Sequence, residues 1–216
     1  QCGAFYRADG PEEMRVVGET EFVHGIAAMS RSGIYGNTRI CTGIFSNADM
    51  RMGEAVENVL LAHMSASEYF RGIRTAFPSD LSDEFLEGFS LLGKHNLSFD
   101  NWSPDFDRLP QLAELANRNT DVTVIVNHLG GQINTEAGSD EFARWQSCID
   151  AVADCPNTVI KLGGAQMRVG DWEPGYHMNQ CRDPLSSEEY LELLYPYYRH
   201  CIDAFGVERC MFESNF

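Results

Sequence analysis

Short apolar runs alternate with amphipathic segments along most of the chain. The apolar runs are rich in β-branched and aromatic residues, and the segments between them repeat apolar positions every three or four residues. The runs predict strands over residues 39–45, 70–74, 97–102, 122–128, 158–163 and 209–215. The amphipathic segments predict helices over residues 19–32, 53–67, 83–94, 107–119, 140–154 and 186–205. The pattern therefore predicts a series of β/α units.

Capping residues support several of the predicted helix starts. Ser82 and Ser139 each precede a predicted helix, Ser186 begins one, and Glu189 follows Ser186 at the spacing of a capping box. Neither a Ser/Gly-rich linker nor a break in composition divides the chain. Residues 1–216 are therefore predicted to form a single domain.

The predicted strands favour a parallel sheet. The strand at 122–128 is nearly continuous in apolar character, as expected for a parallel strand covered on both faces. A dinucleotide-binding sheet would carry a GxGxxG motif, and neither that motif nor a P-loop occurs. We therefore predict an α/β fold of the (β/α)₈ TIM-barrel type, in which functional residues lie at the C-terminal ends of the strands.

Composition and charge exclude several classes of function. The chain of 216 residues has 44% hydrophobic residues and a formal net charge of −16, with 16 Lys+Arg against 32 Asp+Glu. This acidic balance argues against nucleic-acid binding, and no apolar run approaches the roughly 20 residues that cross a bilayer. The seven cysteines are odd in number and contain no CxxC pair, which favours reduced thiols. We expect a cytoplasmic protein without nucleic-acid or membrane partners.

Polar residues at the predicted strand ends form the candidate site. Arg74 ends one strand and offers a planar donor fork to a carboxylate or a lactone carbonyl, or pairs with a neighbouring acid at the rim. Asp100 and Trp102 share one face of the next strand, opposite Phe99. His128 closes the following strand, where an imidazole can ligate a metal or shuttle a proton.

Five further residues extend this candidate set. Lys161 is a charge within an otherwise apolar strand, and it either holds a substrate anion or fills the barrel interior as a paired cation. Glu213 and Asn215 project the same way from the last strand, where a carboxylate can act as a general base or a metal ligand. Arg7, in a Gly-Pro loop, and His177, in the long loop after the strand of Lys161, are further substrate-binding candidates.

The remaining histidines have weaker claims. His24, His63 and His200 lie within helical patterns and are expected to face solvent. His95 precedes a strand, which places it at the end of a barrel that serves stability rather than function.

Four segments at the strand ends together resemble one family. They are Phe70-Arg-Gly-Ile-Arg74, Val126-Asn-His-Leu-Gly-Gly131, Val159-Ile-Lys-Leu-Gly-Gly164 and Cys210-Met-Phe-Glu-Ser-Asn-Phe216. Over essentially its whole length the chain resembles the amidohydrolase-related TIM-barrel hydrolases, in particular the lactonase-like branch of L-fuconolactone, pyrone-dicarboxylate and sulfomuconolactone hydrolases. The resemblance implies a (β/α)₈ barrel with His128 as the mid-barrel histidine, a metal ligand in metal-dependent members. It also implies that Arg74 binds substrate.

Two features depart from the family pattern. The family's first strand carries a His-x-His pair that belongs to the metal site, and no His-x-His occurs in this sequence. Alignment with the pattern places that strand before Gln1 and the last helix after Phe216, so we expect an incomplete barrel, truncated at both ends. Asn215 stands where the family has an aspartate, so either Glu213 supplies the carboxylate or the activity differs.

Three hypotheses follow. The first is a hydrolase that opens a lactone or ester of a small anionic substrate, with Arg74, Asp100, His128 and Glu213 converging on one pocket. The second is a metal-dependent non-oxidative decarboxylase of the same superfamily. One divalent ion, zinc or manganese, is expected in the family, although some lactonase relatives work without a metal. The third is an inactive fragment, whose exposed strand edges would favour association into homo-oligomers.

Overall fold

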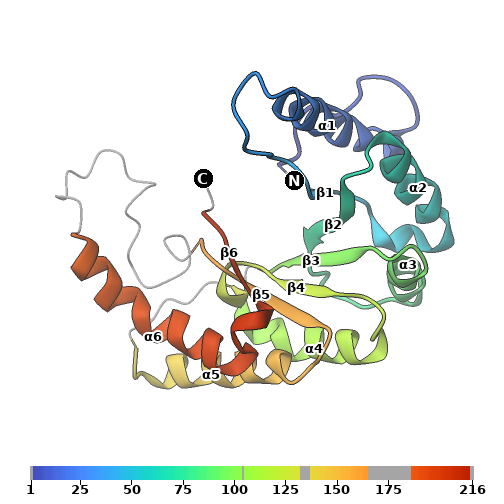
Figure 1. The fold of residues 1–216 in the computed structure, drawn as a ribbon. Helices are drawn as coiled ribbons and strands as arrows, with labels where there is room; N and C mark the ends of the chain where they lie inside the picture. The colour runs from blue at the N-terminus through green and yellow to red at the C-terminus, as the bar shows by residue number, and fades with distance from the viewer. Residues whose placement is uncertain (1, 104, 132–136, 165–185, 215–216) are drawn as a thin grey trace, which may run out of the picture. The chain divides into compact units, whose positions relative to one another are not determined.

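The computed structural model describes residues 2–103, 105–131, 137–164 and 186–214, and the elements are labelled in Figure 1. The strands are β1 (Ile44–Ser46), β2 (Phe70–Ala76), β3 (Ser98–Trp102), β4 (Val124–Val126), β5 (Thr158–Leu162) and β6 (Cys210–Phe212). The helices are α1 (Val17–Arg31), α2 (Val56–Ala66), α3 (Asp83–Lys94), α4 (Leu109–Arg118), α5 (Asp140–Ala153) and α6 (Ser187–Phe205). In the sheet the strands follow one another in the order β1-β2-β3-β4-β5-β6. This alternation of strands and helices confirms the predicted α/β class.

The predicted elements are all present, and their bounds differ mainly at the ends. The helix predicted over 83–94 is α3, whereas the strand predicted over 39–45 is only Ile44–Ser46. Residues 39–43 are mostly exposed and lie outside the strand ladder, so their apolar character does not make them part of the sheet. The chain contains two compact units, residues 1–100 and 101–216, and the single domain predicted from the sequence stays a prediction.

In the first unit, β1 and β2 pair in parallel across an irregular register. Ile44 pairs with Phe70, but the next residue, Phe45, pairs with Gly72. A Cβ atom at Gly72 would lie 2.7 Å from the ring of Phe45, so glycine permits this close approach. Further along, Phe99 of β3 packs edge-on against Phe89 of α3, with ring centroids 5.1 Å apart.

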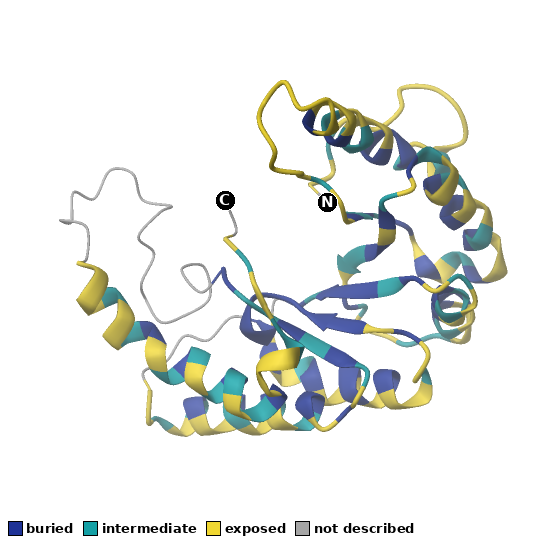
Figure 2. Cartoon of the chain, viewed as in Figure 1, coloured by how far each residue is buried: buried dark blue, intermediate teal, exposed yellow. Residues whose placement is uncertain are grey.

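In the second unit, β4, β5 and β6 pair in parallel, with Val124 opposite Thr158 and Ile160 opposite Cys210. Helices α4, α5 and α6 lie along one side of these strands (Figure 1). The side chains between helices and strands are buried, as the dark blue segments of Figure 2 show. Trp145 of α5 and Tyr197 of α6 are among the largest of them, and their rings lie 5.4 Å apart.

The predicted helix caps are confirmed. The hydroxyls of Ser82, Ser139 and Ser186 each accept a hydrogen bond from a backbone N–H in the first turn of α3, α5 and α6. Glu189 completes the capping box by accepting a hydrogen bond from the backbone N–H of Ser186 at 2.8 Å. Each cap satisfies donors that a helix start otherwise leaves open.

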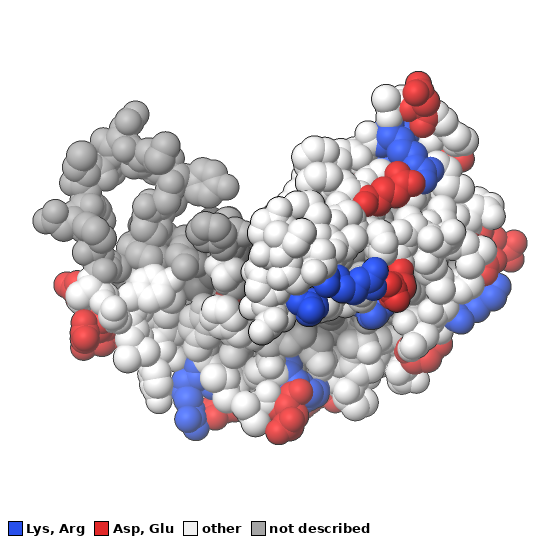
Figure 3. All heavy atoms as spheres, turned by 45° about the horizontal axis from the view of Figure 1, so that its top comes forward, with Lys and Arg blue, Asp and Glu red and all other residues white. Residues whose placement is uncertain are grey.

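Many surface charges lie in pairs of opposite sign, and Figure 3 shows basic and acidic side chains next to one another. Arg31 pairs with Glu68 at 2.9 Å, and Arg144 pairs with Asp107 at 2.8 Å. Among the described residues, no helix combines the length and the apolar character needed to span a bilayer.

Candidate active site

His128 lies directly beyond the C-terminal end of β4. Its side chain is only 1% exposed. The backbone of His128 has φ 46° and that of Leu129 has φ 57°, both in the left-handed region that non-glycine residues rarely adopt. Such strained backbone persists only where the surrounding structure enforces it, and it occurs often at functional sites.

The turn that carries His128 is held from several directions. The indole Nε1–H of Trp145 donates a hydrogen bond to the carbonyl of Leu129 at 3.0 Å. The N–H of Gly130 donates to the carbonyl of Asn127 at 2.9 Å. Gly131 has φ 140°, and a Cβ atom there would lie 2.6 Å from the backbone nitrogen of Phe106. The two glycines after Leu129 therefore permit a tight turn, with Gly130 against the side chains of Leu109 and Ile149 and Gly131 against backbone, rather than a phosphate-binding loop.

Glu213, just beyond β6, contacts both His128 and Lys161. Its Oε2 atom lies 2.8 Å from Nδ1 of His128, and its Oε1 atom lies 3.6 Å from Nζ of Lys161. Lys161 and Glu213 are 18% and 15% exposed, so all three groups are largely withdrawn from solvent. Three successive strands thus bring an imidazole, an ammonium and a carboxylate together.

The described residues do not make a metal site. No three His, Cys, Asp or Glu side chains gather closely enough in that part of the chain to hold a cation. His128 and Glu213 are close, but the ammonium of Lys161 stands beside the same carboxylate.

The other strand-end candidates from the sequence have mixed placements. Asp100 and Phe99 are both buried in β3, and Trp102 ends the same strand half-buried. Arg74 is half-buried near the end of β2, within the first unit. The predicted convergence of Arg74 and Asp100 with His128 and Glu213 stays a prediction.

Arg7 has a defined partner. Its guanidinium forms an exposed ion pair with Glu21 of α1, in which Nε donates to Oε2 at 3.1 Å. This pairing raises the pKa of Arg7 and lowers that of Glu21. His177 and Asn215 lie outside the described residues.

The prediction that the helical histidines face solvent is wrong for two of them. His200 is only 18% exposed, and its Nε2 atom lies 3.0 Å from a carboxylate oxygen of Asp150. His63 is fully buried rather than facing solvent. Its Nδ1 atom lies 2.8 Å from the hydroxyl of Thr20, its Nε2 atom lies 3.0 Å from the carbonyl of Asn47, and its ring stacks on Phe70. Burial lowers the pKa of His63 to about 4, although the Asn47 carbonyl acts in the opposite direction. The helical pattern of residues 53–67 did not show which face this histidine occupies.

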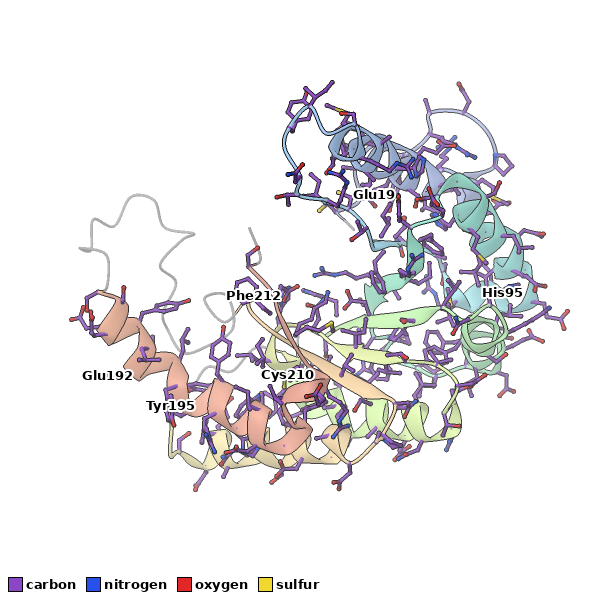
Figure 4. All side chains as sticks on the ribbon, viewed as in Figure 1. Glu19, His95, Glu192, Tyr195, Cys210 and Phe212 are labelled. Atoms are coloured by element: carbon purple, nitrogen blue, oxygen red, sulfur yellow. The ribbon has the colours of Figure 1, made fainter. Side chains whose placement is uncertain are left out.

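Sequence reasoning also missed Tyr198 on α6. Burial, with a smaller contribution from the charge of Glu213, raises the pKa of this phenol to about 12. Tyr198 lines a cavity of about 900 Å³ between α6 and β6, which Glu213 also borders. Tyr195 and Phe212 belong to the same lining and are labelled in Figure 4. The spacing of Tyr190, Leu194 and Tyr198, four residues apart, was the available signal for this helix face.

A family model described as Amidohydrolase matches residues 42–216. An uncharacterized protein, y4mH of Sinorhizobium fredii, is 30% identical over 213 residues, which covers 92% of this chain and 61% of that protein. The chain thus spans about three-fifths of this curated relative.

Solved structures show the same fold at lower identity. A zinc-bound amidohydrolase from Burkholderia multivorans has a TM-score of 0.68 at 22% identity, over 91% of this chain and 63% of that one. A putative 2-pyrone-4,6-dicarboxylic acid hydrolase from Pseudomonas putida has a TM-score of 0.55 at 15% identity, over 80% of this chain and 56% of that one. This likeness agrees with the incomplete (β/α)₈ barrel predicted from the sequence. Because the family model covers most of its residues, the chain belongs to the Amidohydrolase family.

Proposed function

We propose that the protein is a hydrolase that opens a lactone or ester of a small, carboxylated substrate by activating water. The observation that carries this proposal is the contact of Glu213 with both His128 and Lys161. These groups come from the ends of β4, β5 and β6, where barrel enzymes place their chemistry.

Glu213 and His128 supply the proton transfer in this proposal. The carboxylate of Glu213 faces the Nδ1 edge of the imidazole at ion-pair distance, which leaves Nε2 as the nitrogen that can take a proton from water. The water oxygen then forms a bond to the acyl carbon, and the ring C–O bond breaks. The proton on Nε2 passes to the departing oxygen, so that a carboxylic acid and a hydroxyl group result. In this arrangement Glu213 acts through His128 rather than directly on water.

The substrate class follows from the charge of the site and from the relatives. Lys161 places a cation beside Glu213, where it can attract a substrate carboxylate in a chain that is otherwise strongly acidic. The Pseudomonas putida neighbour is named a putative hydrolase of 2-pyrone-4,6-dicarboxylic acid, which is a lactone with two carboxylates. Arg74 stays a substrate-binding prediction from the family resemblance.

Side-by-side assays test this function. The protein is incubated with lactones that carry one or two carboxylates and, separately, with aromatic acids, and ring opening and carbon dioxide release are measured. Ring opening that falls at least 100-fold in Glu213→Gln supports the proposal, because general acid–base groups contribute about 10²–10⁴-fold. Glu192→Gln on α6 is the matched control, because this glutamate is exposed and lies away from β6, as the labels in Figure 4 show.

Two results would contradict the proposal. Carbon dioxide release without ring opening would identify a decarboxylase, and equal activity of Glu213→Gln and the unaltered protein would remove Glu213 from the reaction. Elemental analysis of the same samples measures whether a divalent ion such as zinc or manganese accompanies activity. Sedimentation of these samples tests the expected association of copies.

A further inference from the structure

The end of β5 carries two glycines that approach both partners of the site. Gly163 and Gly164 follow Leu162 directly, and both are buried. The first passes the backbone of Glu213, and the second passes the ring of His128. No other described pair of adjacent glycines touches both of these residues.

Gly164 lies against the imidazole itself. A Cβ atom at this position would lie 2.8 Å from Cγ and 3.0 Å from Cε1 of His128, and closer still to Nδ1. Carbon atoms in contact normally stay about 3.5–4.0 Å apart. Gly164 also has φ 69°, so its backbone conformation favours glycine independently of the space available.

Gly163 makes the equivalent approach to the other partner. A Cβ atom there would lie 2.7 Å from both the carbonyl carbon and the Cβ atom of Glu213. The N–H of Glu213 in turn faces the carbonyl of Leu162 at 3.4 Å. The same short segment therefore fixes where Glu213 leaves β6 and where the ring of His128 can lie.

We propose that Gly164 is a positioning residue for His128: its bare backbone forms a wall that holds the imidazole with Nδ1 toward Glu213. The strained backbone of His128 is itself fixed by the contact of Trp145 with Leu129. The ring is thus confined between its own turn and the end of β5. The kinetic consequence rests on the proposed hydrolase function, whereas the confinement itself does not.

A glycine elsewhere in the same unit offers a matched control for backbone strain. Gly206, at the end of α6, has φ 75°, and a Cβ atom there would have no neighbour within 4 Å, so Gly206→Ala measures the cost of the backbone conformation alone. Gly164→Ala adds the overlap with His128 to the cost of placing alanine at a positive φ. We expect Gly206→Ala to lower the Tm by roughly 2–4 °C and Gly164→Ala to lower it at least twice as far.

A double substitution separates confinement from general damage. His128→Ala removes the ring that the new methyl group would meet. Gly164→Ala introduced into His128→Ala should therefore lower the Tm no further than the Gly206→Ala control does. If Gly164→Ala costs as much in the His128→Ala background as in the unaltered protein, the wall does not act on the imidazole, and the proposal is overturned.

Two further readouts follow the imidazole and the reaction. In a ¹H–¹³C spectrum of the histidine Cε1 groups, Gly164→Ala should shift the His128 signal, assigned by its loss in His128→Ala, and Gly206→Ala should not. Ring opening by Gly164→Ala should fall about 100-fold in kcat with little change in KM, because a displacement of about 1 Å can cost that much. An unmoved His128 signal would also overturn the proposal. The Tm effects of Gly164→Ala and His128→Ala could be coupled, and the His128 signal could shift, in a protein that opens no lactone. That result would support the positioning role of Gly164 and reject the proposed function.

Discussion

The buried histidine of the first unit gives a stability prediction whose size can be worked out. His63 is enclosed by Thr20 of α1, Asn47 beyond β1 and Phe70 of β2. The Asn47 carbonyl can only accept a hydrogen bond, so the neutral ring carries its proton on Nε2 and accepts from Thr20 at Nδ1. Protonation at Nδ1 would place a charge where water does not reach.

Acid should therefore destabilise this unit within a defined pH range. The pKa of His63 is lowered by burial from 6.5 to about 4, so between these values the unfolded chain binds a proton that the folded chain does not. The free energy of unfolding falls as the pH decreases through this range and is independent of His63 above about pH 6.5. The full loss is roughly 3 kcal/mol, because one pKa unit corresponds to about 1.4 kcal/mol.

The measurement needs a probe that reports on residues 1–100. The three tryptophans of the sequence all lie after residue 100, so urea titrations are followed by far-UV circular dichroism and by hydrogen exchange of α1 and α2 at pH 7.5 and pH 4.5. His63→Gln keeps a donor for Asn47 but has no titrating ring, so between these two pH values its free energy of unfolding should fall by about 2.5 kcal/mol less than that of the unaltered protein. His24→Gln, which removes a half-buried histidine of α1, is the control. Its free energy of unfolding should still fall between pH 7.5 and pH 4.5 by most of the amount seen in the unaltered protein. An equal loss in His63→Gln and the unaltered protein would refute the reasoning.

Three further predictions test the site and its supports. Lys161→Met should raise KM for a carboxylated lactone about 10-fold or more but leave KM for the neutral methyl ester unchanged, with the exposed Lys94→Met as control. Ser186→Ala removes the capping box of α6 and should cost about 1 kcal/mol in urea unfolding, whereas Ser187→Ala should cost less than half of that. Gly131→Ala should lower the Tm by more than about 4 °C, because its methyl group would meet the backbone of Phe106; an unchanged Tm would show that the turn can relax.

The sequence predicted the regular elements because each was indicated by several independent signals. The helix at 83–94 has a serine cap, an amphipathic repeat and a following apolar strand, and all three agree with α3. The first strand shows the limit of this approach. Residues 39–43 carry the apolar character of a strand, but whether they join a ladder depends on a partner far along the chain, which the local pattern does not contain.

The site was only partly predictable for the same reason. That His128, Lys161 and Glu213 share one end of the sheet follows from the periodicity of the strands and the parallel topology. The burial of His63 does not follow, because the sequence pattern of α2 does not show whether the face that carries His63 is buried or exposed. Tertiary packing decides this. The approach of Gly164 to His128 depends on the path of β5 relative to β4, which no spacing within either strand records.

The placement of Glu213 changes how the replacement of the family aspartate by Asn215 is interpreted. From the sequence, a missing carboxylate at the last strand suggested Glu213 as a base acting directly on water. The contact of its Oε2 atom with Nδ1 of His128 instead favours a role for the carboxylate in orienting the imidazole, as in other pairs of a base and its supporting acid. Under the proposed function, His128 then serves as the general base although Asn215 cannot accept a proton from water. The two roles differ experimentally: if Glu213 acts through His128, Glu213→Gln keeps an oxygen facing Nδ1 and should retain more activity than His128→Ala, whereas a direct base would make Glu213→Gln at least as inactive as His128→Ala.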